Sequence, residues 1–479
     1  MKFQDGKPDF ELTYSDVFLI PSHSDVASRL EVSLETDDHT GCSIPLISSN
    51  MNSVTGKRLA ATMARRGGLG VLPQDLSPQD LDLAIRWVKA QHPIFDSPLE
   101  LDCESTVEDA KAVIPPVSGH GIVLRDNSGN FAGSLEAKSL ETALPGAKLS
   151  DLVVDNLPSI DADDVEDPRK AFDLLVEVQT DFAPVVRHGT VIGTLSRNSA
   201  LRSVIYRPNL DSDGRLKVAC AIGINGDLLA KAKALAEAGV DILVIDTAHG
   251  GQSAMLRAVE SVHKLNLGLP IVAGNVVTAD AVNDLVEAGA SIIKVGVGPG
   301  AMCTTRMMTA VGRPQFSAVI ETAEAAGRLG AHVWADGGVR YPRDVALALA
   351  AGASSVMIGS WFAGTIESPG VLKQDHSGKI YKESWGMAST KAVQERFGRL
   401  SPFELAKKTL FAEGISSSKS YLDLFRPSVE DLIDMITSGV RSSLSYAGAD
   451  TLVDFPGKAI VGVQSAAGYE EGKALPVSW

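Results

Sequence analysis

Residues 241–250, DILVIDTAHG, and residues 291–300, SIIKVGVGPG, decide the fold of this chain. In each, an apolar run rich in β-branched residues ends in a polar, glycine-containing turn, which is typical of a buried parallel strand. The same helix-exit phrase precedes both runs, as EAGVD at 237–241 and EAGAS at 287–291, and a related phrase, AAGAS, occupies 350–354. The chain therefore repeats one unit, a helix that ends at glycine followed by a buried strand.

Four similar runs extend this pattern over residues 216–364. They are KVACAIG, PIVAGNV, HVWADGGV and SVMIGS, at residues 217–223, 270–276, 332–339 and 355–360. Strands that alternate with helices form a parallel sheet, either closed into a (β/α)8 TIM barrel or left open as a doubly wound sheet. No GxGxxG fingerprint follows an early strand, so the barrel is favoured. The loops after the barrel strands are then expected to form the active site.

The composition fits a large α/β protein and excludes several classes of function. The chain has 479 residues, 44% of them hydrophobic, and a net charge of -15. Because an acidic surface repels phosphate backbones and anionic lipids, we expect neither a nucleic-acid nor a membrane partner. Four widely spaced cysteines without a CxxC pair indicate neither a disulfide framework nor a zinc site. With no signal peptide and no apolar run of about 18 residues, a cytoplasmic protein is expected.

The loop at residues 296–306, GVGPGAMCTTR, holds the strongest candidate for a reactive group. Cys303 is surrounded there by glycines, hydroxyls and the charge of Arg306, and a cationic neighbour favours the nucleophilic thiolate. An inert buried thiol is the alternative, since free cysteines are usually buried. Two later loops, at 336–338 and 359–360, combine glycine N–H groups with a hydroxyl and suit a phosphate. Ordinary tight turns are the alternative for both loops.

Residues 94–209 interrupt the βα pattern and predict an inserted domain. They contain a degenerate duplication, in which Gly133 and Gly193 take equivalent places. Each half is interpreted as a helix, a hairpin and a second helix, so that two copies can bury a common face. Residues 1–93 and 210–479 are then the two parts of the barrel.

Several motifs, taken together in order, resemble the IMP dehydrogenase/GMP reductase family. They are YSDVFLIPS at 14–22, IPLISSNMNSVT at 44–55, the cysteine loop and the two glycine loops. The insert resembles a tandem CBS (Bateman) module. The resemblance implies a TIM barrel in which Cys303 attacks carbon 2 of a purine nucleotide, where a nicotinamide cofactor exchanges hydride. It also implies regulation by ATP and GTP at the insert, and a homotetramer or octamer.

The resemblance further assigns roles to individual residues. The catalytic candidates are Cys303, Thr305, Glu413 and Asp246, with Thr305 and Glu413 as proton-transfer groups. The nucleotide-binding candidates are Ser49, Met51, Asp336, Gly337, Gly338, Gly359, Ser360, Tyr381, Gly386, Met387 and Gly414. The cofactor candidates are Asp246, Thr247, Ala248 and Gly296. The carbonyl groups of Gly298, Gly300 and Cys303 are candidate ligands of a potassium ion.

Two activities of the family would use this same site. A dehydrogenase oxidises IMP with NAD and hydrolyses the covalent intermediate, whereas a reductase takes GMP and NADPH and releases ammonia. Phe397, after Arg396, stands where the resemblance to dehydrogenases would require a tyrosine that activates water. The phrase WGMASTKAV at 385–393 and Asn50 before Met51 are also similar to reductases. GMP reductase with NADPH is therefore the preferred interpretation.

Other features keep two alternatives open. DTAHG at 246–250 and the insert itself are similar to dehydrogenases, so IMP dehydrogenase with NAD is the first alternative. Pro73 and Gln74 stand where reductases of the family have His-Lys-His and dehydrogenases have histidines, so no catalytic lysine can be assigned by resemblance. Asn52 stands where the family usually has an aspartate. These replacements motivate the second alternative, a purine nucleotide sensor without turnover. Retention of Cys303 argues against the sensor.

Overall fold

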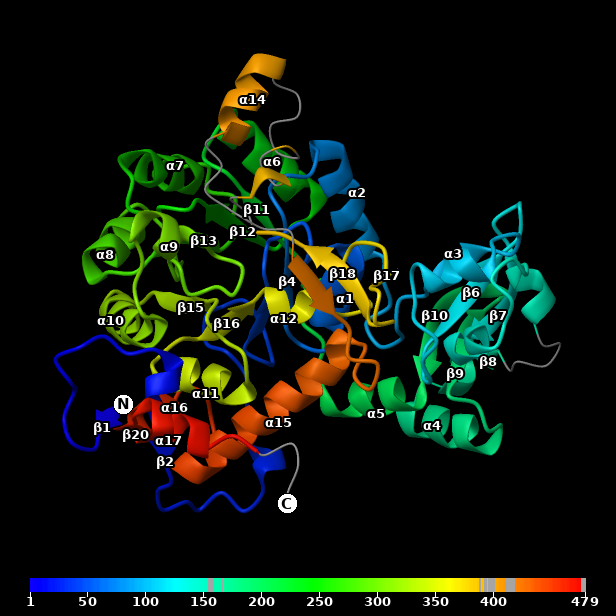
Figure 1. The fold of residues 1–479 in the computed structure, drawn as a ribbon, viewed down its shortest axis with the longest axis horizontal. Helices are drawn as coiled ribbons and strands as arrows, with labels where there is room; N and C mark the ends of the chain where they lie inside the picture. Colours follow the sequence, from blue (N-terminus) through cyan, green and yellow to red (C-terminus); the bar gives the residue numbers. More distant parts are fainter. Residues whose placement is uncertain are drawn as a thin grey trace.

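The computed structural model describes residues 1–153, 159–165, 167–386, 389–391, 394, 401–410 and 418–474. Eight parallel strands close into a barrel, which confirms the predicted (β/α)8 fold (Figure 1). In barrel order these strands are β3 (Leu46–Ser48), β4 (Leu69–Leu72), β11 (Ala219–Ile222), β12 (Ile242–Asp246), β13 (Ile271–Val276), β14 (Ile292–Val295), β15 (His332–Asp336) and β16 (Ser355–Ile358).

Helices surround this barrel and begin and end where the sequence indicates. They are α1 (Lys57–Arg65), α2 (Pro78–Lys89), α6 (Leu228–Ala238), α7 (Ser253–His263), α8 (Ala279–Glu287), α10 (Gln315–Arg328), α11 (Pro342–Ala350) and α15 (Val429–Ala447). Helix α2, for example, starts at Ser77, whose hydroxyl accepts the N–H of Asp80, and continues with Pro78. The glycines of the repeated phrase, Gly239, Gly289 and Gly352, all have positive φ, as helix-ending residues do.

The inside of the barrel is packed and leaves space only at one end. Alternate strand residues, including Val71, Val244 and Trp334, point inward and form one buried cluster. The indole N–H of Trp334 donates to Asp38 at 2.8 Å, which closes the end at which the strands begin. Two short helices follow strands at the opposite end, α9 (Thr305–Thr309) and α12 (Ser360–Ala363).

Segments near the two ends of the chain meet beside α11 and α15 (Figure 1). Strand β20 (Ile460–Val463) lies between β1 (Lys2–Phe3) and β2 (Val17–Ile20) in a three-stranded sheet. The flanking segments contain the 3-10 helices η1 (Tyr14–Asp16) and η2 (Arg29–Glu31) and the helices α16 (Phe455–Lys458) and α17 (Ala466–Glu471). In the part of the chain that the structure describes, no helix is both long and apolar enough to cross a membrane.

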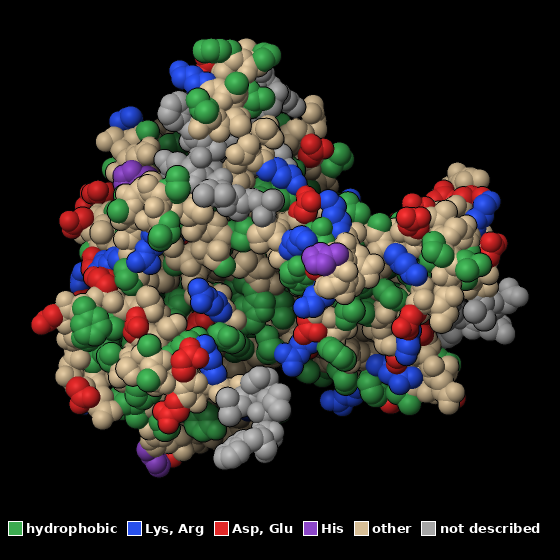
Figure 2. Space-filling model, in the orientation of Figure 1, with side chains coloured by type: hydrophobic (Ala, Val, Ile, Leu, Met, Phe, Trp, Pro, Cys, Tyr) green, Lys and Arg blue, Asp and Glu red, His purple; other side chains and the backbone are tan. Residues whose placement is uncertain are grey.

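The inserted segment forms a lobe beside the barrel (Figures 1 and 2). Its first half contains β5 (Glu100–Asp102), α3 (Val107–Lys111), β6 (Gly121–Arg125), β7 (Phe131–Glu136), η3 (Ala137–Glu141) and η4 (Leu149–Leu152). Its second half contains β8 (Ile160–Asp161), η5 (Ala162–Val165), α4 (Pro168–Glu177), β9 (Phe182–Arg187), β10 (Thr190–Ser196) and α5 (Arg197–Ile205). Acidic and basic side chains are interspersed over the face seen in Figure 2.

The two halves share their strand pairing. In each, the first strand runs parallel to the second, and the second runs antiparallel to the third. The hairpin register shifts between Phe131 and Gly133 in one half and between Val191 and Gly193 in the other. A bulge at the same place supports the duplication inferred from these glycines. The halves differ in the helix that follows the hairpin, which is the 3-10 helix η3 in the first half and the α-helix α5 in the second.

A further small sheet follows the barrel strands. It consists of β17 (Lys373–Gln374), β18 (Ile380–Ser384) and β19 (Ser418–Tyr421), and helix α14 (Pro402–Leu410) precedes β19. Met387, Arg396, Phe397, Glu413 and Gly414, to which the sequence analysis assigned roles, lie outside the described residues. Their roles therefore stay predictions.

Candidate active site

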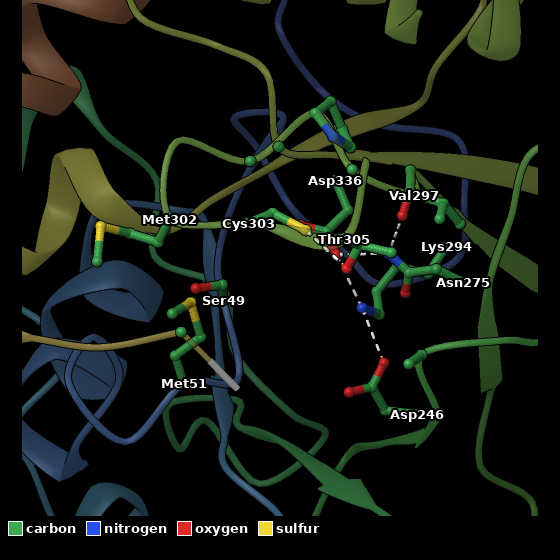
Figure 3. Close-up of a pocket in the computed structure, with 18 of the residues that line it drawn as sticks. Ser49, Met51, Asp246, Asn275, Lys294, Val297, Met302, Cys303, Thr305 and Asp336 are labelled. Carbon is green, nitrogen blue, oxygen red and sulfur yellow. Dashed lines mark hydrogen bonds and ion pairs between the residues drawn. The ribbon is translucent and has the colours of Figure 1, made fainter. Parts of the chain in front are cut away.

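A cavity of about 670 Å³ opens at the ends of the barrel strands, where the sequence predicts the active site (Figure 3). Ser49 and Met51 lie on one side, Asp246 lies on the other, and Cys303 lies between them. Most of the residues predicted for the site line this cavity: Ser49, Met51, Asp246, Thr247, Ala248, Gly296, Gly298, Gly300, Cys303, Thr305, Asp336, Gly337, Gly338, Gly359, Ser360 and Gly386. The βα loops thus bring together groups that are more than 300 residues apart.

Cys303 presents an accessible thiol to this cavity. The residue is exposed, whereas Cys42 and Cys220 are buried, and burial raises the pKa of Cys42 to about 12. The Cys303 Sγ lies 3.2 Å from the hydroxyl oxygen of Thr305, to which it can donate. The alternative of an inert buried thiol is therefore wrong. Arg306 is exposed and is not among the cavity residues, so Thr305 is the polar neighbour that the structure brings to the sulfur.

A buried lysine organises the wall opposite Ser49. Lys294 on β14 is 3% exposed, and its ammonium group lies 2.9 Å from Asp246 and 2.8 Å from Asp336. Burial by itself would lower the pKa of Lys294, but the two carboxylates outweigh burial and raise it. The side-chain amides of Asn50 and Asn275 donate to Asp246 and Asp336, each at 2.9 Å. These contacts fix the two carboxylates at the cavity wall.

The predicted glycine loops pack closely against the cysteine loop and the first strand. Gly337 and Gly338 both have φ of 84°, and a Cβ on Gly337 would lie 3.3 Å from the backbone nitrogen of Gly300. A Cβ on Gly359 would lie 3.1 Å from the Ser49 hydroxyl and 3.3 Å from the Met51 sulfur. Glycine at these positions therefore permits close approach of the loops that are predicted to bind the nucleotide.

Sequence comparison assigns this site to a family. The model of the IMP dehydrogenase / GMP reductase domain matches residues 11–474. The chain belongs to this family. It is 52% identical over 481 residues to GMP reductase of Mycobacterium tuberculosis, with both chains covered completely. It is 36% identical to inosine-5'-monophosphate dehydrogenase of Staphylococcus aureus, over 92% of this chain and 91% of that protein.

A solved structure supports the same assignment. The chain is similar to a cysteine-to-alanine variant of GMP reductase from Trypanosoma brucei in complex with guanosine 5'-monophosphate, with a TM-score of 0.69 and 30% identity. The match covers 98% of this chain and 99% of that chain. The family inferred from the motifs is thus confirmed, and the protein is an oxidoreductase of the IMP dehydrogenase/GMP reductase family, which acts on purine nucleotides.

Tyr381, which the resemblance to the family assigned to the nucleotide site, does not line the cavity. It lies on β18 with its ring centroid 5.9 Å from that of Tyr421, and the Lys419 ammonium lies 4.6 Å from its ring. Side chains alternate along a strand, so Lys382 and Ser384 point inward while Tyr381 faces the other side. Gly386, just beyond this strand, does reach the cavity.

Several residues that line the cavity were not predicted from the sequence. Asn275 and Lys294 line the cavity at the ends of strand runs that the sequence analysis had recognised. The lysine in the apolar run SIIKV could have indicated a site of buried charges, because an ionic side chain in a buried strand requires partners. Asn225 and Lys408 also line the cavity, and neither stands in a pattern that marks it.

No cluster of three or more His, Cys, Asp or Glu side chains suited to a metal ion occurs among the described residues. The potassium prediction concerns carbonyl groups instead, those of Gly298, Gly300 and Cys303. The carbonyl of Gly300 accepts the N–H of Cys303 at 3.0 Å. The potassium site stays a prediction.

Proposed function

We propose that this protein is a GMP reductase, which uses NADPH to convert GMP to IMP and ammonia. The observation that carries the proposal is the accessible Cys303 thiol beside Thr305 in the cavity at the strand ends. The end-to-end similarity to a GMP reductase, at 52% identity, supports the reductive direction over the oxidative one. Asn50 next to Met51 supports the same direction, as a feature that resembles reductases.

In the proposed reaction, the Cys303 thiolate adds to carbon 2 of GMP. The carbon–nitrogen bond then breaks, and the amino group takes up a proton and leaves as ammonia, so that a thioimidate joins Cys303 to the purine. Hydride adds to carbon 2, the carbon–sulfur bond breaks, and IMP and the thiolate are released. NADPH supplies the hydride when it is bound. Thr305 lies close enough to the sulfur to pass a proton to the departing amino group.

The cavity has the size of a ligand site. Its volume of about 670 Å³ falls within the range of typical ligand sites, about 300–1,000 Å³. We assign the GMP phosphate to the loops at 336–338 and 359–360, whose glycines expose N–H groups. We assign the nicotinamide end of the cofactor to residues 246–248 on the opposite wall, so that carbon 2 lies between the sulfur and the hydride donor.

We further propose a regulatory role for the insert. In this proposal, residues 94–209 form a tandem CBS domain between the barrel segments 1–93 and 210–479, and ATP and GTP bind to it and change the rate. The matched strand pairing of its two halves supports a duplicated module. The proposed assembly is a homotetramer or octamer in the cytoplasm. Four free cysteines are in keeping with that compartment.

NAD-dependent oxidation of IMP is the second candidate, favoured by the 36% identity to a dehydrogenase. Nicotinamide absorbance separates the two when the protein is given GMP with NADPH and, in parallel, IMP with NAD, with ATP and GTP each present and absent. We expect oxidation of NADPH with GMP and little reduction of NAD with IMP. The reverse result would establish the dehydrogenase, and nucleotide binding without turnover in either assay would favour the sensor.

A further inference from the structure

Lys382 is a buried cation that the proposed reaction does not use. It lies on β18 and is 2% exposed. Its ammonium group donates to the carbonyl oxygens of Thr365 at 2.9 Å and Ser368 at 2.6 Å, with the Ile366 carbonyl at 3.4 Å. All these acceptors are neutral. Burial lowers the pKa of Lys382 to about 7, so an ammonium group is costly to keep at this position.

The segment that accepts these hydrogen bonds is the continuation of α12. Thr365 donates to the carbonyl of Phe362, and Ser368 donates to that of Ala363, each at 2.8 Å. The segment therefore moves with α12, which begins at Ser360 on the cavity wall. On its other side, Glu367 accepts the N–H of Val429 at 2.8 Å, which fixes the segment to the start of α15.

Strand β18 leads to another part of the same cavity. Gly386, two residues beyond the strand, lines the cavity. The Ser384 hydroxyl lies 3.3 Å from that of Ser53, in the loop that carries Met51. Helix α12 lies beside β18 (Figure 1). Lys382 thus joins two segments that bring Ser360 and Gly386 to the cavity, and it does so through three donors that a hydrocarbon side chain lacks.

We propose that Lys382 is a positioning residue for the nucleotide phosphate. By joining residues 365–368 to β18, it sets the separation between Gly359–Ser360 and Gly386. The nucleoside part of the ligand depends on other walls of the cavity, so loss of this contact weakens binding of the phosphate in particular. The inference rests on the proposed function for the identity of the ligand, GMP.

The test compares Lys382→Met with the matched control Lys379→Met, which changes an exposed lysine just before the same strand. Calorimetry measures the Kd of GMP and of guanosine, and steady-state kinetics give KM and kcat. Because three buried carbonyls lose their donor, we expect the Kd and KM of GMP to rise about 10- to 100-fold in Lys382→Met. The Kd of guanosine and kcat should change by less than about threefold, and Lys379→Met should resemble the wild type.

Three outcomes would overturn the proposal. A folded Lys382→Met protein with wild-type affinity for GMP would remove its basis, and equal weakening of GMP and guanosine would indicate a general structural role. If Lys382→Met does not fold, Lys382→Gln replaces it, because the glutamine side chain is one bond shorter and has two N–H donors instead of three. An unchanged preference for GMP over guanosine in Lys382→Gln would also overturn the proposal. The Kd can be measured without turnover. A wild-type protein that binds GMP but does not convert it would therefore contradict the proposed function and not the role of Lys382. If only IMP binds, IMP and inosine serve as the probes.

Discussion

Two buried ionic clusters in this molecule have similar chemistry and different surroundings. The cavity cluster, Asp246, Lys294 and Asp336, forms part of the wall of the 670 Å³ cavity. The junction cluster lies between the barrel and the insert. In it, Arg66 contacts Asp96 at 2.8 Å and Glu430 at 2.6 Å, and Arg202 contacts Glu430, Asp431 and Asp434.

The two clusters differ in the size of the cavity beside them. Asp96 and Glu430 line a cavity of about 50 Å³, which is too small for a nucleotide. The members of the junction cluster come from the residue after α1, from α5 and α15, and from the start of the insert, so their contacts hold two lobes together. Buried charge alone therefore does not mark an active site. Buried charge beside an open cavity and an accessible thiol is the stronger indication of a functional site.

The largest effect is expected in the cavity. Cys303→Ser removes the nucleophile, so kcat should fall by about 1,000-fold or more while GMP still binds. Turnover is followed by NADPH oxidation, and binding by calorimetry. Cys103→Ser, which changes a half-buried thiol of the insert, is the control and should keep full activity. Substantial turnover by Cys303→Ser would exclude covalent catalysis by this residue.

Loss of the lysine in the cavity cluster should rank second. Lys294→Met leaves Asp246 and Asp336 without their common cation, so we expect kcat/KM to fall about 100-fold and the free energy of unfolding to fall by about 3 kcal/mol. Steady-state kinetics and urea unfolding measure the two effects. Lys233→Met, an exposed substitution on α6, is the control. Unchanged kinetics in a folded Lys294→Met protein would show that the two clusters do not differ in function.

Disruption of the junction cluster should lower stability without lowering activity. Glu430→Gln breaks buried ion pairs with Arg66 and Arg202, so the free energy of unfolding should fall by about 3 kcal/mol. The kcat measured without effectors should stay within about twofold of the wild type, because no member of this cluster lines the large cavity. Urea unfolding and the NADPH assay test this, with the exposed Glu237→Gln as the control. A large loss of kcat with normal stability would contradict the purely structural role of the junction cluster.

Acid should remove the contribution of Glu430. Burial opposes ionisation of this carboxyl, but the charges of Arg66 and Arg202 outweigh burial and lower its pKa to about 2. A carboxyl whose pKa is lower in the folded state stabilises the fold above its unfolded pKa of about 4.3, and loses that effect as pH falls further. The stability difference between wild type and Glu430→Gln should therefore be complete at neutral pH and shrink between about pH 4.3 and pH 2. A stability difference that grows as the pH falls would contradict a lowered pKa of Glu430.

The smallest effect is expected at Tyr381. Its ring packs against Tyr421 outside the cavity, so Tyr381→Phe should leave the KM of GMP within about twofold of the wild type. Steady-state kinetics measure this. A clear rise in KM would mean that Tyr381 reaches the nucleotide during turnover.

The barrel was predictable because its signals are local and repeated. Three helix ends marked by glycine, each followed by an apolar run, identify the βα unit. Cys303 stands in a loop whose position after a strand follows from that unit. The role of Lys294 was harder to predict, because its partners lie on other strands of the barrel. Asp246 is on β12, two strands away from β14, and Asp336 is on the adjacent strand β15, so the three side chains meet only in the folded barrel. Tyr381 does not line the cavity, and its predicted contact with the nucleotide stays a prediction. Which face of a strand a residue occupies depends on the register of that strand, and a short motif does not determine the register.

The product balance of the reaction is the most direct test of whether the protein is a GMP reductase. Purified protein is incubated with GMP and NADPH, and NADPH oxidised, ammonia released and IMP formed are measured in the same sample. A GMP reductase should give equal amounts of the three, and Cys303→Ser should give no measurable amount of any of them. NADPH that is not oxidised with GMP, together with NAD that is reduced with IMP, would contradict this function.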